Sequence, residues 1–134
     1  MSSERRERGS KKMNELMSNA DQRLLDSLGK VAPDLAGYVL DFVFGDLYSR
    51  SGLDLKTKQI LTITVLATLG NAKPQLAYHI RCALNIGITK QEIIDIITHI
   101  SGYAGFPAAL NGIATAKEVF SEEEKHEQQK KQGS

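Results

Sequence analysis

The sequence predicts an all-α protein, folded as a single-domain helical bundle of about six helices. Three observations support this fold class. Each of the three prolines precedes an apolar stretch with helical spacing, glycines follow several of those stretches, and the one strand-like segment has no strand partner elsewhere. A length of 134 residues, with 41% hydrophobic and 25% charged residues, suits one globular domain. The predicted helices cover residues 13–29, 33–44, 55–69, 74–86, 90–104 and 107–122.

The ends of these helices carry capping signals. Proline is favoured in the first helical turn because its missing N–H would have no partner there, and glycine closes helices because it adopts the left-handed conformation. Asp54 is positioned as the N-cap of the helix that follows it, and Thr89 with Glu92 predicts a capping box. The residues that mark starts and ends are Pro33, Pro74 and Pro107, and Gly70, Gly87 and Gly105.

Two segments allow more than one interpretation. Residues 60–69 are rich in β-branched side chains, but the run from Asp54 is longer than most strands, so we expect a helix. Its apolar residues surround the axis almost completely, which predicts a central, buried helix. The last helix has a small-residue face that suits either packing within the chain or a subunit interface: Ala108, Ala109, Gly112, Ala114 and Ala116.

Both ends of the chain are polar. Residues 1–12 hold five basic residues and two glutamates with almost nothing to bury, so we expect a disordered basic extension. Residues 123–134 predict a polar, disordered tail. The folded domain is therefore expected over residues 13–122.

Composition excludes several classes of function. The body lacks the clustered positive charge that binds nucleic acid, and its apolar runs are far shorter than a membrane span requires. The single cysteine excludes an internal disulfide, a four-thiolate zinc site and a CxxC redox pair. No convergent set of ligands predicts a metal site. No charged-then-apolar leader opens the chain, so we expect a cytoplasmic protein.

Two histidines lie in predicted helices, and histidine is the usual general acid or base near neutral pH. His79 falls beside the apolar stripe of its helix, a position that either borders a pocket or holds a structural, hydrogen-bonded histidine. His99 has Asp95 four residues before it and Tyr103 four after it, so a carboxylate–imidazole contact is available. His79 is the first candidate for acid–base chemistry.

The connection over residues 44–54 combines Asp46, Tyr48 and Arg50 with two glycines. Its polar groups either satisfy the backbone of the loop itself or form the rim of a pocket. In the second case the guanidinium of Arg50 would bind a carboxylate in a planar, two-pronged contact.

Three stretches taken together resemble the γ-carboxymuconolactone decarboxylase family. They are residues 44–54 (FGDLYSRSGLD), 79–93 (HIRCALNIGITKQEI) and 103–111 (YAGFPAALN), and the resemblance extends over about residues 20–120. The wider family includes alkylhydroperoxidase-D-type proteins, small all-helical chains that assemble into trimers or hexamers. The resemblance therefore implies an alkylhydroperoxidase-D-like fold and a homo-oligomer.

The redox branch of that family has a CxxC followed by a histidine four residues after the second cysteine, with a glutamate upstream. Counted back from His79, the two cysteine positions hold Ala72 and Gln75, and the glutamate position falls near Gln59. Both thiols are absent, so the resemblance points to the decarboxylase branch. That branch converts 4-carboxymuconolactone to 3-oxoadipate enol-lactone and CO2 in aromatic-acid breakdown, without a metal or organic cofactor.

The resemblance implies a carboxylated small molecule as substrate, an acid/base group, a donor to the developing oxyanion and a cation for the substrate carboxylate. Arg50 is preferred over Arg81 as that cation, because Arg81 lies two residues from His79 and projects from a different side of the helix. The expected site residues are His79 and Tyr103 as catalytic groups, and Asp46, Tyr48, Arg50 and Arg81 as substrate-binding groups.

Two other functions stay open on the sequence. One is a peroxide-handling, peroxiredoxin-like antioxidant protein that uses Cys82 alone, which requires a thiol with a low pKa. The other is a non-catalytic, oligomeric protein that keeps the fold and binds a small molecule.

Overall fold

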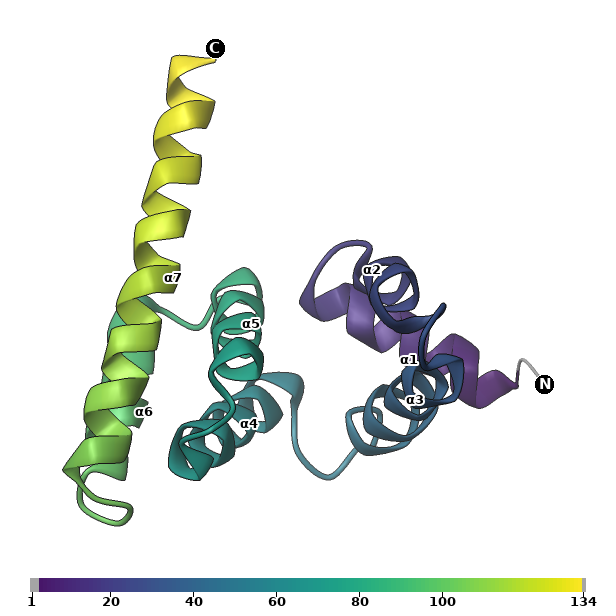
Figure 1. Cartoon of the computed structure of the whole chain (residues 1–134), viewed down its shortest axis with the longest axis horizontal. Helices are drawn as coiled ribbons and strands as arrows, with labels where there is room; N and C mark the ends of the chain where they lie inside the picture. The colour runs from purple at the N-terminus through teal and green to yellow at the C-terminus, as the bar shows by residue number, and fades with distance from the viewer. Residues whose placement is uncertain (1–2, 134) are drawn as a thin grey trace. The chain divides into compact units, whose positions relative to one another are not determined.

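The computed structural model describes residues 3–133, and all regular secondary structure within them is helical, which confirms the predicted all-α class. Contacts divide the chain into two units, one ending at Lys58 and the other beginning at Gln59. The elements, labelled in part in Figure 1, are α1 (Glu4–Leu16), α2 (Ala20–Leu28), α3 (Pro33–Tyr38), the π-helix η1 (Val39–Leu47), α4 (Leu55–Leu69), α5 (Lys73–Asn85), α6 (Lys90–Ile100) and α7 (Phe106–Gln132).

The capping signals in the sequence mark the helix ends that the structure has. Pro33 is the first residue of α3, and proline is the second residue of both α5 and α7. The Thr89 hydroxyl accepts the backbone N–H of Glu92 at 3.0 Å, and the Glu92 carboxylate accepts the N–H of Thr89 at 3.0 Å. The Asp54 carboxylate accepts the N–H of Thr57 at 2.8 Å. The three helix-ending glycines have positive φ angles: Gly70 at 78°, Gly87 at 98° and Gly105 at 98°.

The first unit begins with a helix where the sequence predicted a disordered extension over residues 1–12. From Glu4 onward these residues belong to α1, and residues 1 and 2 lie outside the described part of the chain. Arginines of α1 bind carboxylates of η1: Arg6 binds Asp41 at 2.6 Å, and Arg5 binds Asp46 at 2.7 Å. These partners lie far along the sequence, so the composition of the first twelve residues did not reveal them.

Two glycines allow α1 and η1 to pack backbone against backbone. A Cβ placed on Gly9 would overlap the carbonyl oxygen of Leu40, and it would lie 3.1 Å from the nitrogen of Gly45. A Cβ on Gly45 would lie 2.6 Å from the carbonyl oxygen of Arg5. Real Cβ atoms do not approach backbone atoms so closely, so both positions require glycine.

Two predicted helices of the first unit have different boundaries in the structure. The helix predicted over residues 13–29 is interrupted after Leu16, and Asn19, which precedes α2, has a φ of 62°. The helix predicted over residues 33–44 continues as η1 to Leu47, so part of the predicted 44–54 loop is helical.

The second unit has an isoleucine-rich core between α4, α5, α6 and α7. In Figure 1, α6 lies alongside the first half of α7. The buried core residues are Ile63, Ala67, Leu76, Ile80, Ala83, Ile88, Ile93, Ile97, Ile100, Ala109, Ala116 and Val119. On the small-residue face of α7, Gly112 is buried close to Ile97, where an added Cβ would lie 3.0 Å from the Ile97 Cγ2 atom. This part of the face packs within the chain.

The prediction that the helix over 55–69 is central and buried is wrong, although its boundaries are confirmed. Only one side of α4 is buried, at Gln59, Ile63 and Ala67. The opposite side leaves Leu61, Val65 and Leu69 exposed at 49%, 56% and 61%. The apolar residues around the axis of α4 therefore divide into a buried side and an exposed apolar stripe.

The end of the chain is also helical where the sequence predicted a disordered tail over residues 123–134. Helix α7 continues to Gln132, and residue 134 lies outside the described part. Ion pairs connect its middle to neighbouring helices: Lys73–Glu118 at 3.1 Å, Arg81–Glu122 at 3.0 Å and Lys90–Glu124 at 3.5 Å. Over residues 3–133, no helix has the combination of length and apolarity that a membrane crossing needs.

Candidate functional site

His79 lies in the middle of α5, beside the side of the helix that packs into the core. Leu76, Ile80 and Ala83 are buried on that side, and their spacing is helical. His79 itself is only partly exposed. This is the position that the sequence predicted, next to the apolar stripe and not opposite it.

The partner of His79 is Gln59 at the start of the second unit. Gln59 is fully buried, at 0% exposure. Its side-chain nitrogen Nε2 donates to the backbone carbonyl oxygen of His79 at 2.9 Å, and the same nitrogen lies 2.8 Å from the ring atom Nδ1 of His79. An amide nitrogen only donates hydrogen bonds, so Nδ1 is the acceptor.

Burial lowers the pKa of His79 to about 4. The imidazole is therefore neutral at pH 7, and since Nδ1 accepts a hydrogen bond, the proton of the ring is on Nε2. The ring of Tyr78 meets the imidazole edge-on, with 5.2 Å between ring centroids. His79 thus carries one ring N–H donor, on the side of the ring away from Gln59.

The depressed pKa of His79 predicts that acid destabilises the fold. The unfolded chain takes up a proton near pH 6.5 and the folded chain near pH 4, so the free energy of unfolding falls as the pH falls between these values. The loss approaches about 3 kcal/mol, because one pKa unit corresponds to about 1.4 kcal/mol. Urea unfolding at pH 7 and pH 4.5 measures it.

The control for this prediction is His79→Gln, which removes the titrating group. Asp41 and Asp46 also have pKa values lowered by their arginine partners. Protonation of these two carboxylates in acid therefore destabilises the wild type and the variant alike. The variant should therefore lose less stability between the two pH values than the wild type. An equal loss in both proteins would contradict the assignment of a depressed pKa to His79.

Cys82 does not have the properties of a reactive thiol. It is fully buried, and burial raises the pKa of its thiol to about 11, against a smaller opposing effect of a hydrogen bond with Tyr78. Thiol reactivity follows the population of thiolate, which is very small at pH 7 for such a group. The structure therefore argues against the peroxide-handling alternative.

Asp46 and Tyr48 lie in the first unit and already have partners there. The carboxylate of Asp46 is bound by Arg5 and, at 3.5 Å, by Arg8, and the hydrogen bond from Arg5 lowers its pKa. Tyr48 is only 8% exposed, and its ring stacks on that of Phe44 with 5.0 Å between centroids. Both residues stabilise the packing of the first unit, and their role at a substrate stays a prediction.

The two candidate arginines differ in what they contact. Arg50 is exposed just after η1, and its backbone carbonyl accepts a hydrogen bond from Lys58, which also binds the carbonyls of Leu47 and Tyr48. The side chain of Arg81 is bound to the carboxylate of Glu122 by two nitrogens, at 3.0 and 3.1 Å. A second carboxylate at Arg81 would have to compete with Glu122.

Tyr103 is 87% exposed on the connection between α6 and α7, and its ring lies 5.3 Å from that of His99. The structure has no hydrogen bond between His99 and Asp95 among the described residues, and the Asp95 carboxylate accepts the side-chain N–H of Gln91 at 3.0 Å. His99 and Asp95 instead line an open surface pocket of about 430 Å³. Tyr103 thus contacts His99, and its catalytic pairing with His79 stays a prediction.

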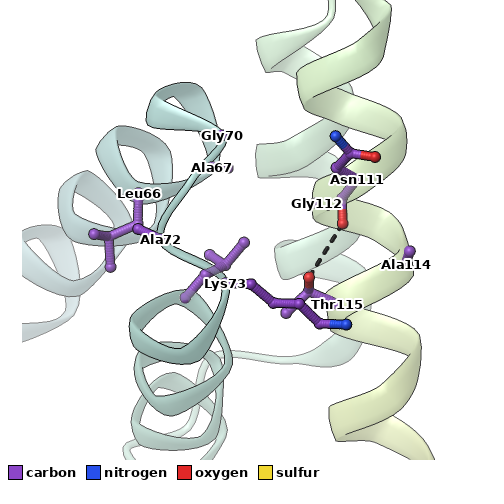
Figure 2. A pocket seen from close by; sticks show the side chains of 10 residues that line it. Leu66, Ala67, Gly70, Ala72, Lys73, Asn111, Gly112, Ala114 and Thr115 are labelled. Carbon is purple, nitrogen blue, oxygen red and sulfur yellow. Dashed lines mark hydrogen bonds between the residues drawn. The ribbon is translucent and has the colours of Figure 1, made fainter.

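A cavity of about 280 Å³ lies where the end of α4 and the start of α5 meet α7. Figure 2 shows its polar side chains, Lys73 from α5 and Asn111 with Thr115 from α7. The Thr115 hydroxyl donates to the backbone carbonyl oxygen of Asn111 at 3.1 Å, so it is satisfied by its own helix. None of the predicted site residues lines this cavity.

No group of three or more histidine, cysteine or carboxylate side chains within residues 3–133 is arranged to hold a metal ion. The site that the second unit does assemble is a neutral histidine, oriented by a buried amide.

A model of the carboxymuconolactone decarboxylase family matches residues 33–118, well over half of the chain. The protein belongs to the carboxymuconolactone decarboxylase family. One relative is the 4-carboxymuconolactone decarboxylase of Acinetobacter baylyi, which is 37% identical over 75% of this chain and 74% of its own length. An uncharacterised 15.0 kDa protein of Paracoccus denitrificans is 35% identical over 83% of this chain and 81% of its own length.

A more distant relative is the nitrosuccinic acid decarboxylase of Metarhizium robertsii, which is 29% identical over 63% of this chain and 58% of its own length. The family match includes η1, all of α4, α5 and α6, and therefore both Gln59 and His79.

Sequence reasoning missed the contact between Gln59 and His79. In the structure, Gln59, Ile63 and Ala67 recur every four residues and form the buried side of α4. A polar side chain that continues a buried apolar stripe requires a hydrogen-bond partner. A histidine on the next helix is such a partner.

Proposed function

We propose that the protein is a cofactor-free decarboxylase of a carboxylated lactone, converting 4-carboxymuconolactone to 3-oxoadipate enol-lactone and CO2. The observation that carries this proposal is the oriented, neutral His79 within the part of the chain that matches the family. Two relatives, a 4-carboxymuconolactone decarboxylase and a nitrosuccinic acid decarboxylase, have decarboxylation in common.

The chemistry requires no electron acceptor outside the substrate. The bond between the ring carbon and the carboxyl carbon breaks, CO2 leaves, and the electron pair is delocalised into the lactone. A proton then adds to the lactone carbon skeleton. A donor beside the developing oxyanion lowers the barrier, and His79, the acid–base candidate of the sequence, is the residue that we assign to this donation.

We assign the binding of a substrate carboxylate to Arg50, because the guanidinium of Arg81 is already bound to Glu122. Arg50→Gln should raise KM roughly 10–100-fold, the loss expected for a hydrogen bond to a charged group. Arg81→Gln is the matched control and should change KM little. Steady-state kinetics of both variants decide between them, and the reverse pattern would move the role to Arg81.

The proposal includes self-association through the exposed side of α4. Leu61, Val65 and Leu69 form a stripe at helical spacing, and all three are about half exposed or more. Val65→Lys should lower the mass measured by light scattering from that of a trimer or hexamer to that of a monomer. An unchanged mass in this variant, or a monomeric wild type, would contradict the assignment.

The enzymatic test uses purified, chelator-treated protein. Loss of 4-carboxymuconolactone is followed beside that of nitrosuccinate, with each product identified by NMR. We expect turnover of the lactone and none or much less of nitrosuccinate. Saturable binding of the lactone without turnover would overturn the decarboxylase proposal in favour of a non-catalytic binding protein.

A further inference from the structure

We propose that Gln59 is a positioning residue that fixes His79 in the tautomer with its proton on Nε2, so that a neutral imidazole donates a hydrogen bond to the oxyanion formed on loss of CO2. The assignment of the tautomer follows from contacts within this chain and does not depend on the substrate. The catalytic half of the inference rests on the proposed function.

The orientation of the Gln59 amide is determined by the backbone of His79. The carbonyl oxygen of His79 only accepts hydrogen bonds, so the group 2.9 Å from it must be the amide nitrogen and not the amide oxygen. The nitrogen carries two hydrogens, and the second is available to Nδ1 at 2.8 Å. Rotating the amide by half a turn would place its oxygen against the carbonyl and lose both bonds.

The two hydrogen bonds from the Gln59 amide, here called the clamp, exclude a proton on Nδ1. A hydrogen there would point at an N–H donor, and the amide nitrogen has no lone pair to accept it. A neutral imidazole carries one hydrogen, which must then be on Nε2. Because Gln59 is fully buried, water does not offer the amide an alternative partner, and breaking its bonds would leave a buried polar group unsatisfied.

The pKa of His79 is determined by burial, because no charged partner within residues 3–133 contributes to its shift. On its own helix Tyr78 lies edge-on to the ring, and Cys82, three residues further along, has a thiol that is protonated at neutral pH. Arg81 on the same helix is neutralised by Glu122 of α7. From α4 the partner is the uncharged Gln59. Burial is the cause of the low pKa of His79.

The clamp has a consequence for the reaction. When the bond to the carboxyl carbon breaks, its electron pair is delocalised onto the carbonyl oxygen of the lactone, and Nε2–H stabilises that charge by a hydrogen bond. Water supplies the proton that the carbon then takes up. A neutral imidazole keeps its proton throughout and does not have to be reprotonated between turnovers. The rate of turnover should therefore not depend on the titration of His79 above about pH 5.

The tautomer is measured directly by 15N NMR of the histidine side chains in the full-length wild type, with His79 assigned by its absence in His79→Gln. We expect an unprotonated Nδ1 and a protonated Nε2, unchanged between about pH 5 and pH 8. The exposed His126 is the reference for an averaged ring in the same spectrum. A protonated Nδ1, or an averaged signal like that of His126, would overturn the inference whatever the activity.

Two variants test the catalytic half. Gln59→Met keeps the length of the side chain and removes the donor, and Gln59→Glu replaces the donor with an acceptor that favours a proton on Nδ1. Both should lower kcat about 10–100-fold with little change in KM, the size of the loss found for residues that orient metal-bound histidines. In Gln59→Glu the pKa of His79 measured by NMR should rise, and the pH profile of kcat should shift with it.

A double-variant cycle separates positioning from a general structural effect. If Gln59 acts through His79, adding Gln59→Met to His79→Ala should lower kcat no further. Multiplicative losses would overturn the positioning role, as would an unchanged kcat in a Gln59→Met protein whose tautomer is averaged. A wild type with the expected tautomer but no turnover would overturn the proposed function and leave the tautomer assignment standing.

Discussion

Replacing His79 with alanine should lower kcat for 4-carboxymuconolactone by about 10²–10⁴-fold, the contribution of a positioned acid–base or donor group. The physical reason is that Gln59 orients the imidazole ring, whose N–H is on the side away from this contact. KM should change much less, because the contact strengthens only as negative charge develops. Steady-state kinetics at pH 7 measure both constants.

The matched control is His99→Ala. His99 is also on a helix, but it is exposed and its ring contacts Tyr103. Its loss should leave kcat within about twofold, since surface substitutions seldom matter. Full activity in the His79 variant, together with a loss in the His99 variant, would move the chemistry to the surface pocket that His99 and Asp95 line.

The second large effect concerns stability. Gly9→Ala should destabilise the first unit by about 1–3 kcal/mol, the usual cost of forcing an extra carbon into a packed contact. The added Cβ would overlap the carbonyl oxygen of Leu40, and backbone atoms of a helix cannot move aside as a flexible side chain can. Urea unfolding, with hydrogen exchange to locate the change, measures the effect.

The sign of this effect is diagnostic, because alanine is a better helix former than glycine by about 1 kcal/mol. Without the close contact the substitution would stabilise α1. Lys11→Ala, at an exposed position of the same helix, is the control and should change stability little. A Gly9→Ala protein more stable than the wild type would show that α1 and η1 do not pack at this distance.

The sequence predicted those features that depend on neighbouring residues. Asp54 and the pair Thr89 and Glu92 cap their helices through bonds across three residues, and Gly87 closes its helix by its own backbone freedom. Such signals are complete within one turn of chain. For the same reason α4 has the predicted bounds.

Features that depend on distant residues were not predictable in this way. Helix α1 has acidic partners 35 and 41 residues away, so its arginines appeared to have nothing to bind. The exposed side of α4 was not distinguishable from its buried side, because both are apolar. His79 was found from its place beside the apolar stripe, but its clamp comes from Gln59 on another helix, 20 residues earlier.

Release of CO2 from 4-carboxymuconolactone labelled with 13C in the 4-carboxyl group is the most direct test of decarboxylation by His79. Chelator-treated wild-type protein should release one labelled CO2 for each enol-lactone formed, at a rate nearly constant between about pH 5 and pH 8, because His79 stays neutral over that range. No labelled CO2 at any pH in this range, from folded protein with Gln59 and His79 intact, would contradict it.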